Sequence, residues 1–358
     1  MEGDLIHINE WLRPFSWLYG GAVWFRNWLF DTGLIKGQEF QRPVICVGNI
    51  TVGGTGKTPH IELLIRMLQG DHRVAVLSRG YKRKSSGFRL AYVTTTMQEI
   101  GDEPWQIKQK FPDIVVAVDA NRRRGLTRLF SDPETKDIDV ALLDDAYQHR
   151  YVRAKLSILL TDYHRLITDD CLLPAGRLRE PLSAKNRANI VIVTKCPSDM
   201  KPMEYRIVQT ALSLKPYQKL FFSTLRYGRP YRLFSETPGV EEELTADTHI
   251  LLLTGIALPQ QMILDLKQVT RHITPLSFAD HHDFRERDIQ KIEATFTELQ
   301  GSKRLIITTE KDASRLLAVK NFSPILRRHI YVLPIEVEIQ RNQLEEFRQL
   351  ILDSVKQG

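Results

Sequence analysis

The sequence predicts an α/β protein: a doubly wound, mostly parallel sheet with helices on both faces, a smaller second α/β domain and an N-terminal amphipathic helix. Three observations support this prediction. Short β-branched apolar runs alternate with helical stretches from residue 43 onward. A glycine-rich loop follows the first run. A second set of runs begins after a Glu-rich stretch at 241–243. With 358 residues, 42% of them hydrophobic and 26% charged, the chain can bury a sizeable core and is neither disordered nor fibrous.

The first thirty residues predict an amphipathic helix at a membrane surface. The uncharged run at 14–25 has only twelve residues, and a bilayer span needs about twenty. Four of the five tryptophans of the chain lie in this region, and Trp17, Trp24 and Trp28 share one helical face. Such aromatics suit the headgroup region, because the indole places an apolar body and a polar N–H across the boundary. The alternative is a helix packed on the protein's own core.

The apolar runs predict the strands in order. The main sheet is expected to use 44–48, 74–78, 114–118, 140–144, 156–160 and 190–194. A strand at 221–225 follows, the second set is 250–255, 304–309 and 330–335, and a final helix is expected at about 340–355. The expected segments are an N-terminal membrane-interface helix at 1–35, a core domain at 36–220, linker strands at 221–245, a smaller α/β lid domain at 246–335 and a C-terminal helix at 336–358 that could return to the core.

A phosphate-binding loop (P-loop) follows the run at 44–48. It comprises Gly53, Gly54, Thr55, Gly56, Lys57 and Thr58, the last two at the start of an amphipathic helix. Glycines let backbone N–H groups surround phosphate oxygens, while Lys57 can reach the β and γ oxygens and Thr58 can hold Mg²⁺. Thr51 stands where the strict pattern has glycine, but strand, loop and helix come in the expected order. The loop therefore predicts a nucleotide site.

Two carboxylates are expected beside this loop. Asp144 and Asp145 follow the apolar run at 140–143, and the carboxyl ends of parallel strands meet at one edge of the sheet, where ligands bind. A Mg²⁺-nucleotide site needs such an acid, so we expect the metal to be held by Thr58 together with Asp144 or Asp145. The alternative, a carboxylate that only caps a loop, fits one aspartate better than two.

These motifs belong to a longer pattern that resembles the tetraacyldisaccharide 4′-kinases, the lipid A 4′-kinases of Gram-negative bacteria. The resemblance covers nearly the whole chain. Its nine ordered blocks are GNITVGGTGKTP (48–59), LSRGYKRKS (77–85), GDEP (101–104), LLDDAYQHR (142–150), LLPAGRLREPL (172–182), VTKCP (193–197), TGIALP (254–259), FADHHDF (278–284) and TTEKDASRL (308–316). The departure from the family is Ala146-Tyr147, where the family usually has Gly-Phe; Tyr keeps an aromatic ring and nothing catalytic is put in doubt.

The resemblance implies a kinase that transfers the γ-phosphoryl group of MgATP to the 4′-hydroxyl of a tetraacyl glucosamine disaccharide 1-phosphate in lipid A biosynthesis. The cofactors are then ATP and Mg²⁺. The resemblance also implies that Asp102 is the catalytic base, paired with His281 from the second domain when that domain closes, and that Lys57 and Asp145 complete the catalytic set. The alternatives are a helix-capping role for Asp102 and a metal site within 280–283.

Substrate-binding residues are expected in two loops: one lies just past the strand predicted at 74–78, and the other is a proline-bounded loop after Leu173-Pro174. They are Arg79, Tyr81, Lys82, Arg177, Arg179 and Glu180. The formal net charge of +7 favours anionic partners, and a phosphorylated glycolipid is the one that the resemblance implies. For each residue the alternative is a solvated surface charge or a surface ion pair.

Two rival functions fit the sequence less well. A regulatory P-loop GTPase should carry N-K-x-D, but Thr194 replaces the asparagine and Asp199 stands four residues after Lys195. A nucleic-acid-binding ATPase is supported only by the net charge and the basic cluster at 79–89; no base-stacking aromatic array accompanies the loop. We therefore expect no nucleic-acid partner.

The expected location is the cytoplasmic face of the bacterial inner membrane, with peripheral attachment through the N-terminal helix. Cys46, Cys171 and Cys196 are odd in number and lack C-x-x-C spacing, so neither a disulfide framework nor a zinc site is predicted. The opening Met-Glu-Gly-Asp has no basic n-region ahead of an apolar core, which argues against a secretory signal. The sequence leaves the oligomeric state open.

Overall fold

The computed structural model describes residues 8–234, 241–255, 260–279, 282–317, 319 and 321–356. The chain forms two compact units: unit 1 comprises Met1–Leu225 and Val337–Gly358, and unit 2 comprises Arg226–Glu336. Unit 2 is thus inserted into unit 1, and strands β8 (Lys219–Tyr227) and β14 (Ile335–Ile339) each run across a unit boundary. The predicted five-part division and the role of a lid stay predictions.

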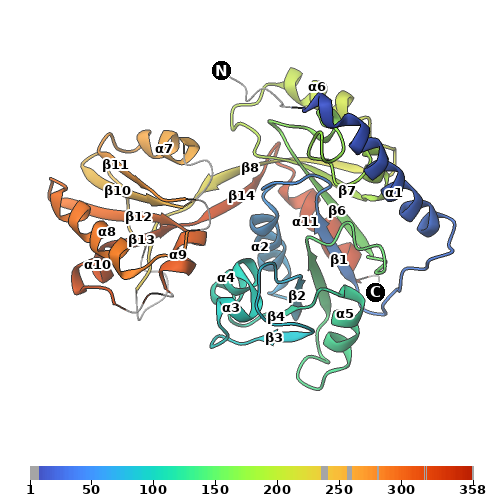
Figure 1. Ribbon diagram of the computed structural model, residues 1–358, viewed down its shortest axis with the longest axis horizontal. Coiled ribbons are helices and arrows are strands. Elements are labelled where there is room, and N and C mark those ends of the chain that lie inside the picture. The colour runs from blue at the N-terminus through green and yellow to red at the C-terminus, as the bar shows by residue number, and fades with distance from the viewer. Residues whose placement is uncertain are drawn as a thin grey trace. The chain divides into compact units, whose positions relative to one another are not determined.

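Unit 1 is built on one large sheet. Its other strands are β1 (Val44–Gly48), β2 (Val74–Ser78), β3 (Arg89–Ala91), β4 (Val115–Val118), β5 (Val140–Asp144), β6 (Leu156–Asp162) and β7 (Ile190–Thr194). The strand order among the described residues is β14-β8-β7-β6-β1-β5-β2-β4-β3 (Figure 1). Neighbours from β8 to β4 pair in parallel, and β3 is antiparallel to β4. The predicted mostly parallel sheet is confirmed; β3 and β14 were not predicted.

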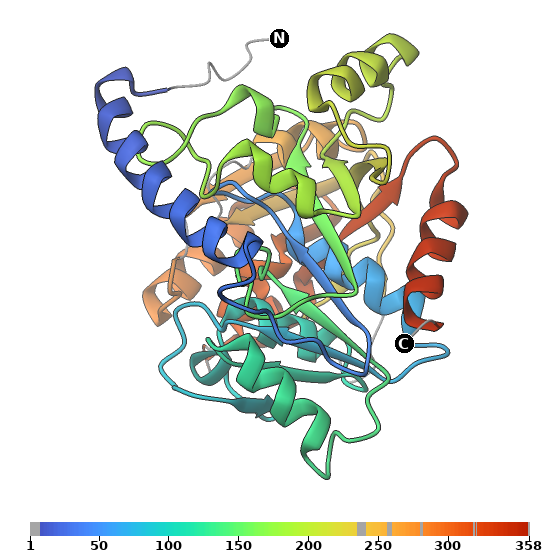
Figure 2. The same ribbon diagram turned by 90° about the vertical axis from the view of Figure 1, so that its right-hand side faces the viewer.

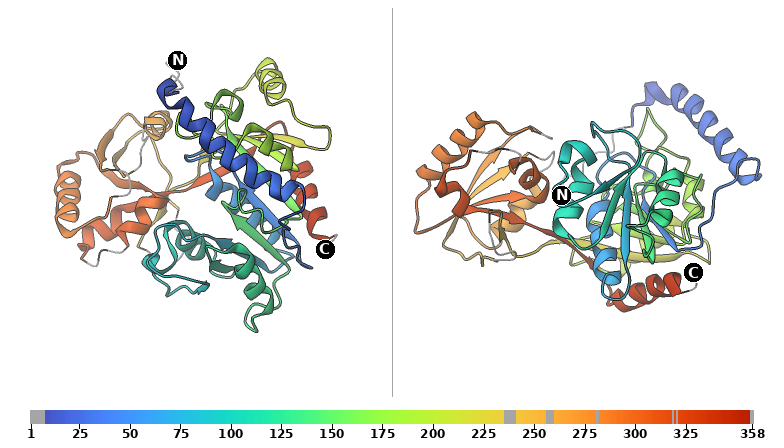
Figure 3. Two further views of the ribbon diagram at one scale, coloured as in Figure 1. Left: turned by 45° about the vertical axis from the view of Figure 1, so that its right-hand side comes forward. Right: turned by 90° about the horizontal axis from the view of Figure 1, so that it is seen from below.

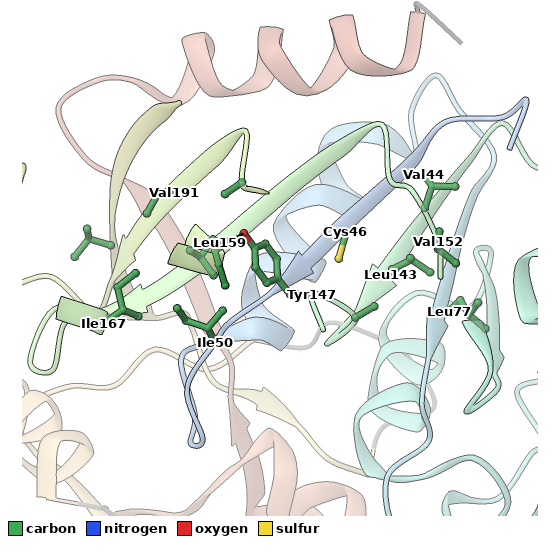
Figure 4. Packing of buried hydrophobic residues seen from close by; sticks show 14 of the residues in the cluster. Val44, Cys46, Ile50, Leu77, Leu143, Tyr147, Val152, Leu159, Ile167 and Val191 are labelled. Atoms are coloured by element: carbon green, nitrogen blue, oxygen red, sulfur yellow. Dashed lines mark hydrogen bonds between the residues drawn. The ribbon is translucent and has the colours of Figure 1, made fainter. Parts of the chain in front are cut away.

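Helices cover both faces of this sheet, as the doubly wound pattern predicts. On one face lie α2 (Lys57–Leu68), α3 (Met97–Ile100), α4 (Asp102–Lys110) and α11 (Leu344–Lys356), which share a buried cluster with alternate strand residues. Figure 3 shows α2 and α11 side by side, so the C-terminal helix lies on unit 1. The other face carries α5 (Arg122–Ser131), α6 (Pro202–Leu212) and the short helices η2 (Ile167–Asp169) and η3 (Leu182–Arg187). Figure 4 shows its core around Cys46, Leu143 and Tyr147.

The predicted N-terminal helix is α1 (Arg13–Asp31), preceded by η1 (Glu10–Leu12). Figure 2 shows it lying along the segment that follows β6. The Ser16 hydroxyl donates to the Leu172 carbonyl oxygen (2.9 Å), which fixes one face of the helix to unit 1. Other side chains of the helix are exposed, with Trp17 75% and Trp24 61% accessible. In the described part of the chain, no helix combines the length and the apolarity that a bilayer span requires.

Unit 2 is a smaller α/β structure. Its strands are β9 (Tyr231–Arg232), β10 (Thr248–Thr254), β11 (Ile273–Ser277), β12 (Lys303–Thr309) and β13 (Ile330–Leu333), in the order β11-β10-β12-β13-β9, with helices α7 (Gln260–Lys267), α8 (Glu286–Glu298), α9 (Glu310–Leu316) and α10 (Pro324–His329). The single strand predicted at 330–335 is wrong: β13 ends at Leu333, and β14 begins after Pro334 in the other sheet. Proline lacks the N–H that a continuous ladder needs.

Candidate functional site

The predicted phosphate-binding loop connects β1 to α2 at the carboxyl edge of the large sheet. Gly53 (φ 119°) and Gly56 (φ 79°) adopt backbone angles that favour glycine, and α2 begins at Lys57 directly after Gly56. The helix therefore presents its N-terminal N–H groups, which carry partial positive charge, at the loop. This is the geometry that binds phosphate.

A buried asparagine holds the loop and explains why threonine is tolerated at position 51. The side-chain amide of Asn49 donates to the hydroxyl oxygens of Thr51 (3.3 Å) and Thr55 (2.9 Å), and all three residues are buried. The Thr194 hydroxyl, at the end of β7, donates to the Thr55 carbonyl oxygen (3.0 Å). Thr51 thus supplies a hydrogen-bond acceptor that glycine could not.

The two predicted carboxylates lie beside this loop but in different surroundings. Asp144 ends β5, is paired in register with Val47 of β1, and accepts a hydrogen bond from the Ser78 hydroxyl (3.1 Å). Burial, with smaller contributions from the charges of Asp145 and Glu103, raises the pKa of Asp144 to about 6. The residue with a left-handed backbone here is Asp145 (φ 47°), while Ala146 has no positive φ. The replacement of glycine by alanine at position 146 therefore causes no backbone strain.

Asp145 lies between two cationic side chains. Lys57 Nζ is 3.6 Å from its Oδ1, and an Arg179 guanidinium nitrogen is 3.3 Å from its Oδ2. The buried Oδ1 has no hydrogen-bond donor among the described residues. A carboxylate oxygen without a donor, beside a buried second carboxylate and the hydroxyl-bearing Thr58, offers the hard oxygen ligands that Mg²⁺ prefers. The residues present therefore fit a Mg²⁺ ion.

Sequence reasoning missed Arg122 at this site. Its side chain is 4% exposed, and one guanidinium nitrogen donates to the carbonyl oxygens of Asp145 (3.2 Å) and Asp144 (3.5 Å). Burial lowers the pKa of Arg122, and the two aspartates oppose that shift. A sequence signal was available: the run Asn121-Arg122-Arg123-Arg124 begins three residues after the end of the strand predicted at 114–118. The guanidinium of Arg122 therefore holds the backbone of both aspartates.

Asp102 and the basic loop at 79–82 are brought together. Asp102 is the first residue of α4, and the N-cap is Gly101 (φ 94°), so Asp102 is not itself the cap. A side chain at position 101 would place its Cβ 2.8 Å from the Tyr81 carbonyl oxygen, and glycine permits this close approach. Arg79, Tyr81 and Lys82 are exposed.

Asp280 and His281 lie outside the described residues. Of the neighbouring residues, His282 Nε2 is 3.0 Å from an Asp288 carboxylate oxygen. Among the described residues, no group of three or more His, Cys, Asp or Glu side chains is arranged to hold a metal ion. The predicted pairing of His281 with Asp102 therefore stays a prediction.

The loop at 177–180 braces the phosphate-binding loop. The Arg177 carbonyl oxygen accepts from the Val52 N–H, and the Arg179 N–H donates to the Ile50 carbonyl oxygen, both at 2.7 Å. Glu180 is 1% exposed and forms ion pairs with Arg26 of α1 (2.9 Å) and with Arg187. Glu180 therefore ties α1 to the site, while its predicted contact with substrate stays a prediction.

Two buried histidines should make stability fall in mild acid. Burial lowers the pKa of His60 to about 4, and burial with nearby arginines, chiefly Arg122 and Arg26, lowers the pKa of His149 to about 4. At these two sites the unfolded chain, with histidine pKa near 6.5, then binds more protons than the folded chain between about pH 4 and 6.5. The raised pKa of Asp144 acts in the opposite direction and offsets part of this effect below pH 6. We expect the free energy of unfolding to be unaffected above pH 7 and to fall by up to roughly 3 kcal/mol per histidine as the pH drops to 4.

Urea unfolding of the full chain across this pH range checks the expectation. His149→Gln should make the free energy of unfolding depend less steeply on pH. A free energy of unfolding that stays constant between pH 6.5 and 4.5 would contradict it.

Comparison with known proteins gives concordant results. Residues 8–356 match the family model described as LpxK, tetraacyldisaccharide-1-P 4′-kinase. The protein named tetraacyldisaccharide 4′-kinase from Phocaeicola vulgatus is 55% identical over 359 residues, covering 100% of this chain and 98% of that protein. Its namesake from Porphyromonas gingivalis is 43% identical over 357 residues, covering 99% of each. The crystal structure of "apo" form LpxK from Aquifex aeolicus in complex with ATP has a TM-score of 0.73 at 28% identity, covering 97% of this chain and 99% of that one.

Proposed function

The chain belongs to the tetraacyldisaccharide-1-P 4′-kinase family and is an ATP-dependent kinase of lipid A biosynthesis, and from this premise we propose how its residues divide the reaction. The γ-phosphoryl group of ATP goes to the 4′-hydroxyl of a tetraacyldisaccharide 1-phosphate. When bound, ATP supplies the phosphoryl group and Mg²⁺ neutralises charge on its phosphates. Such a reaction needs mainly positioning and charge stabilisation from the protein.

Residues 53–58 hold the triphosphate. The single observation that carries this assignment is the position of Asp145, with an oxygen that lacks a donor, between Lys57 and Arg179. With nucleotide bound, Lys57 and Arg179 neutralise phosphate oxygens, and Thr58, Asp144 and Asp145 hold Mg²⁺. Arg122 fixes the backbone of both aspartates from below.

Asp102 accepts the proton of the acceptor hydroxyl, and His281 supports it. The charge of Glu103, next to Asp102 at the start of α4, contributes to the raised pKa of Asp144, which supports a place for Asp102 near the transferred group. Arg79, Tyr81, Lys82 and Arg177 are exposed and supply cationic and aromatic contacts for an anionic sugar phosphate.

Replacing the metal-binding carboxylates should raise the Mg²⁺ concentration needed for half-maximal activity. We expect at least about a tenfold rise for Asp145→Asn, because the variant loses a charged oxygen ligand, and a smaller rise for Asp144→Asn, whose oxygen is already bonded to Ser78. The measurement is kinase activity against Mg²⁺ at saturating ATP. Asp137→Asn removes an exposed carboxylate that pairs with Arg73 and serves as the control. An unchanged Mg²⁺ requirement in both variants would contradict the assignment.

We also propose that the exposed face of α1 binds the cytoplasmic surface of the inner membrane. Trp11, Trp17, Leu18 and Trp24 are each more than 60% exposed, and such aromatics favour the headgroup region. One face of the helix is already held by unit 1, so the tryptophan face is left for lipid. In this assignment the excess positive charge of the chain binds lipid and substrate phosphates, and nucleic acid has no role.

Removing two tryptophans should reduce membrane binding. Trp17→Ser with Trp24→Ser is expected to weaken association with anionic phospholipid vesicles about 100-fold, since each buried indole contributes at least about 1.5 kcal/mol. Flotation of the full chain with vesicles measures this. The matched control replaces Met203 and Ile207 by serine, because they are similarly exposed apolar residues on α6. Equal binding by the two double variants would refute a specific role for α1.

A further inference from the structure

His60 is a buried residue of α2 that the reaction as proposed above does not use. Its side chain is 2% exposed. Its Nδ1 lies 2.7 Å from the carbonyl oxygen of Gly56, the last residue of the phosphate-binding loop. Its Nε2 lies 3.0 Å from the hydroxyl oxygen of Ser223 in β8, a residue that is 0% exposed.

These partners determine which nitrogen carries the proton in the neutral ring. A carbonyl oxygen can only accept, so Nδ1 must donate to Gly56. Nε2 is then the acceptor and receives the Ser223 hydroxyl proton. The other acceptor near that hydroxyl, the Val193 carbonyl oxygen, is more distant at 3.5 Å. A directed relay therefore runs from Ser223 through His60 to Gly56.

The Gly56 carbonyl controls the direction of the next N–H group. The peptide bond between Gly56 and Lys57 is trans, so its C=O and N–H groups point in opposite directions. With the carbonyl drawn toward the buried ring, the Lys57 N–H points away from the core, toward the loop. Because Gly56 has no side chain and adopts a left-handed backbone (φ 79°, ψ 27°), its own conformation restrains this peptide plane weakly.

Few other N–H groups at the helix start can serve a phosphate. Pro59 has no N–H, and the His60 N–H donates within the helix to Gly56 (3.3 Å). The amides of Lys57 and Thr58 are left at the first turn, so the orientation of the Lys57 amide bears directly on phosphate binding.

We propose that His60 is a positioning residue for the phosphate-binding loop: its ring ties the Gly56 carbonyl to Ser223 of β8 and so aims the Lys57 N–H at the bound phosphate. This inference rests on the proposed assignment of residues 53–58 to ATP. Ser223 lies two residues before the point where β8 leaves unit 1, so the relay joins the nucleotide loop to one of the strands that cross between the units.

Two conservative substitutions separate the halves of the relay. His60→Asn places an amide N–H near the position of Nδ1 and keeps the bond to Gly56, while it loses Ser223. His60→Gln places its amide near Nε2 and keeps Ser223, while it loses Gly56. Both variants lose one buried hydrogen bond, so their thermal midpoints should fall by similar amounts. A purely structural role predicts equal effects on ATP as well.

The readouts are the Kd of ATP by calorimetry on the full chain with Mg²⁺, and KM against kcat for the kinase reaction. We expect His60→Gln to weaken ATP binding and raise its KM about five- to tenfold with little change in kcat, and His60→Asn to weaken ATP binding only about two- to threefold. The inference is overturned if the two variants bind ATP equally well or equally poorly. Lys57→Ala tests the assignment of the loop to ATP separately, and it should bind ATP weakly. If it binds ATP as well as wild type, the loop assignment fails, whatever the two His60 variants do.

Ser223→Ala provides a second test with a smaller change in packing. It should weaken ATP binding two- to threefold in the wild-type background. In the His60→Asn background it should have no further effect, because the asparagine does not reach Ser223. Equal effects in both backgrounds would overturn the relay, since only coupled residues are non-additive in such a cycle.

Discussion

Lys57→Ala is expected to reduce kcat for phosphoryl transfer to the tetraacyldisaccharide 1-phosphate by about a thousandfold. Removing one preorganised group that stabilises transition-state charge typically lowers kcat by a factor of 10²–10³. For cationic groups in phosphoryl transfer the effect on kcat reaches 10³–10⁵. Lys57 lies at the start of α2, 3.6 Å from Asp145, and the variant loses the only side-chain cation within the loop at 53–58. The measurement is transfer of ³²P from γ-labelled ATP to the glycolipid in mixed micelles with Mg²⁺.

Lys219→Ala is the matched control for this experiment. It removes the same charge at the start of β8, at the edge of the sheet opposite the phosphate-binding loop. There Lys219 Nζ lies 3.9 Å from Glu346 Oε1, and the Lys219 side chain is more than half exposed. Its activity should remain within about twofold of wild type. If Lys57→Ala stays folded and retains more than a tenth of wild-type kcat, the loop does not act on the transferred phosphate as proposed.

Asp102→Asn is expected to lower kcat 10²–10⁴-fold, the usual contribution of a general base, while the Kd of ATP changes less than about twofold. Asparagine keeps the shape of the side chain at the first position of α4 but cannot take up the acceptor proton. Single-turnover transfer and ATP calorimetry together separate loss of proton transfer from loss of nucleotide binding.

Glu99→Gln is the control for this second experiment. Glu99 lies three residues upstream and accepts from the Thr96 backbone and hydroxyl in a capping box, a role that glutamine can also fill. Full activity should therefore remain. Full activity in Asp102→Asn instead would exclude Asp102 as the base and leave its position at the start of α4 as a structural role.

Part of the site could be predicted from the sequence because it depends on local rules. Left-handed glycines, the first residue of α2 and the aspartates that end β5 follow from neighbouring residues and from the shared edge of parallel strands. The strand predicted at 330–335 failed for the opposite reason: it was read as one apolar run across Pro334, although β13 and β14 pair in different sheets. The short strands β3 and β9 carry too few residues for a pattern.

Other features of the site depend on partners far apart in the chain. Arg122 donates to backbone oxygens more than twenty positions away. Glu180 pairs with Arg26, 154 positions earlier. His60 meets Ser223 across 163 positions. The basic run at 122–124 draws attention to Arg122, but no local pattern in the sequence names the partners in these three contacts, because they come from segments that only the fold brings together.

The sequence by itself therefore determined the fold class, the phosphate-binding loop, the acid pair and the family, because periodicity, glycine conformation and ordered motifs are written in consecutive residues. Only the tertiary structure decided which charges surround Asp145, which face of α1 is left exposed and what holds the Gly56 carbonyl. Those depend on burial and on hydrogen-bond partners from distant segments, since a buried polar group must find its partner wherever the fold places one.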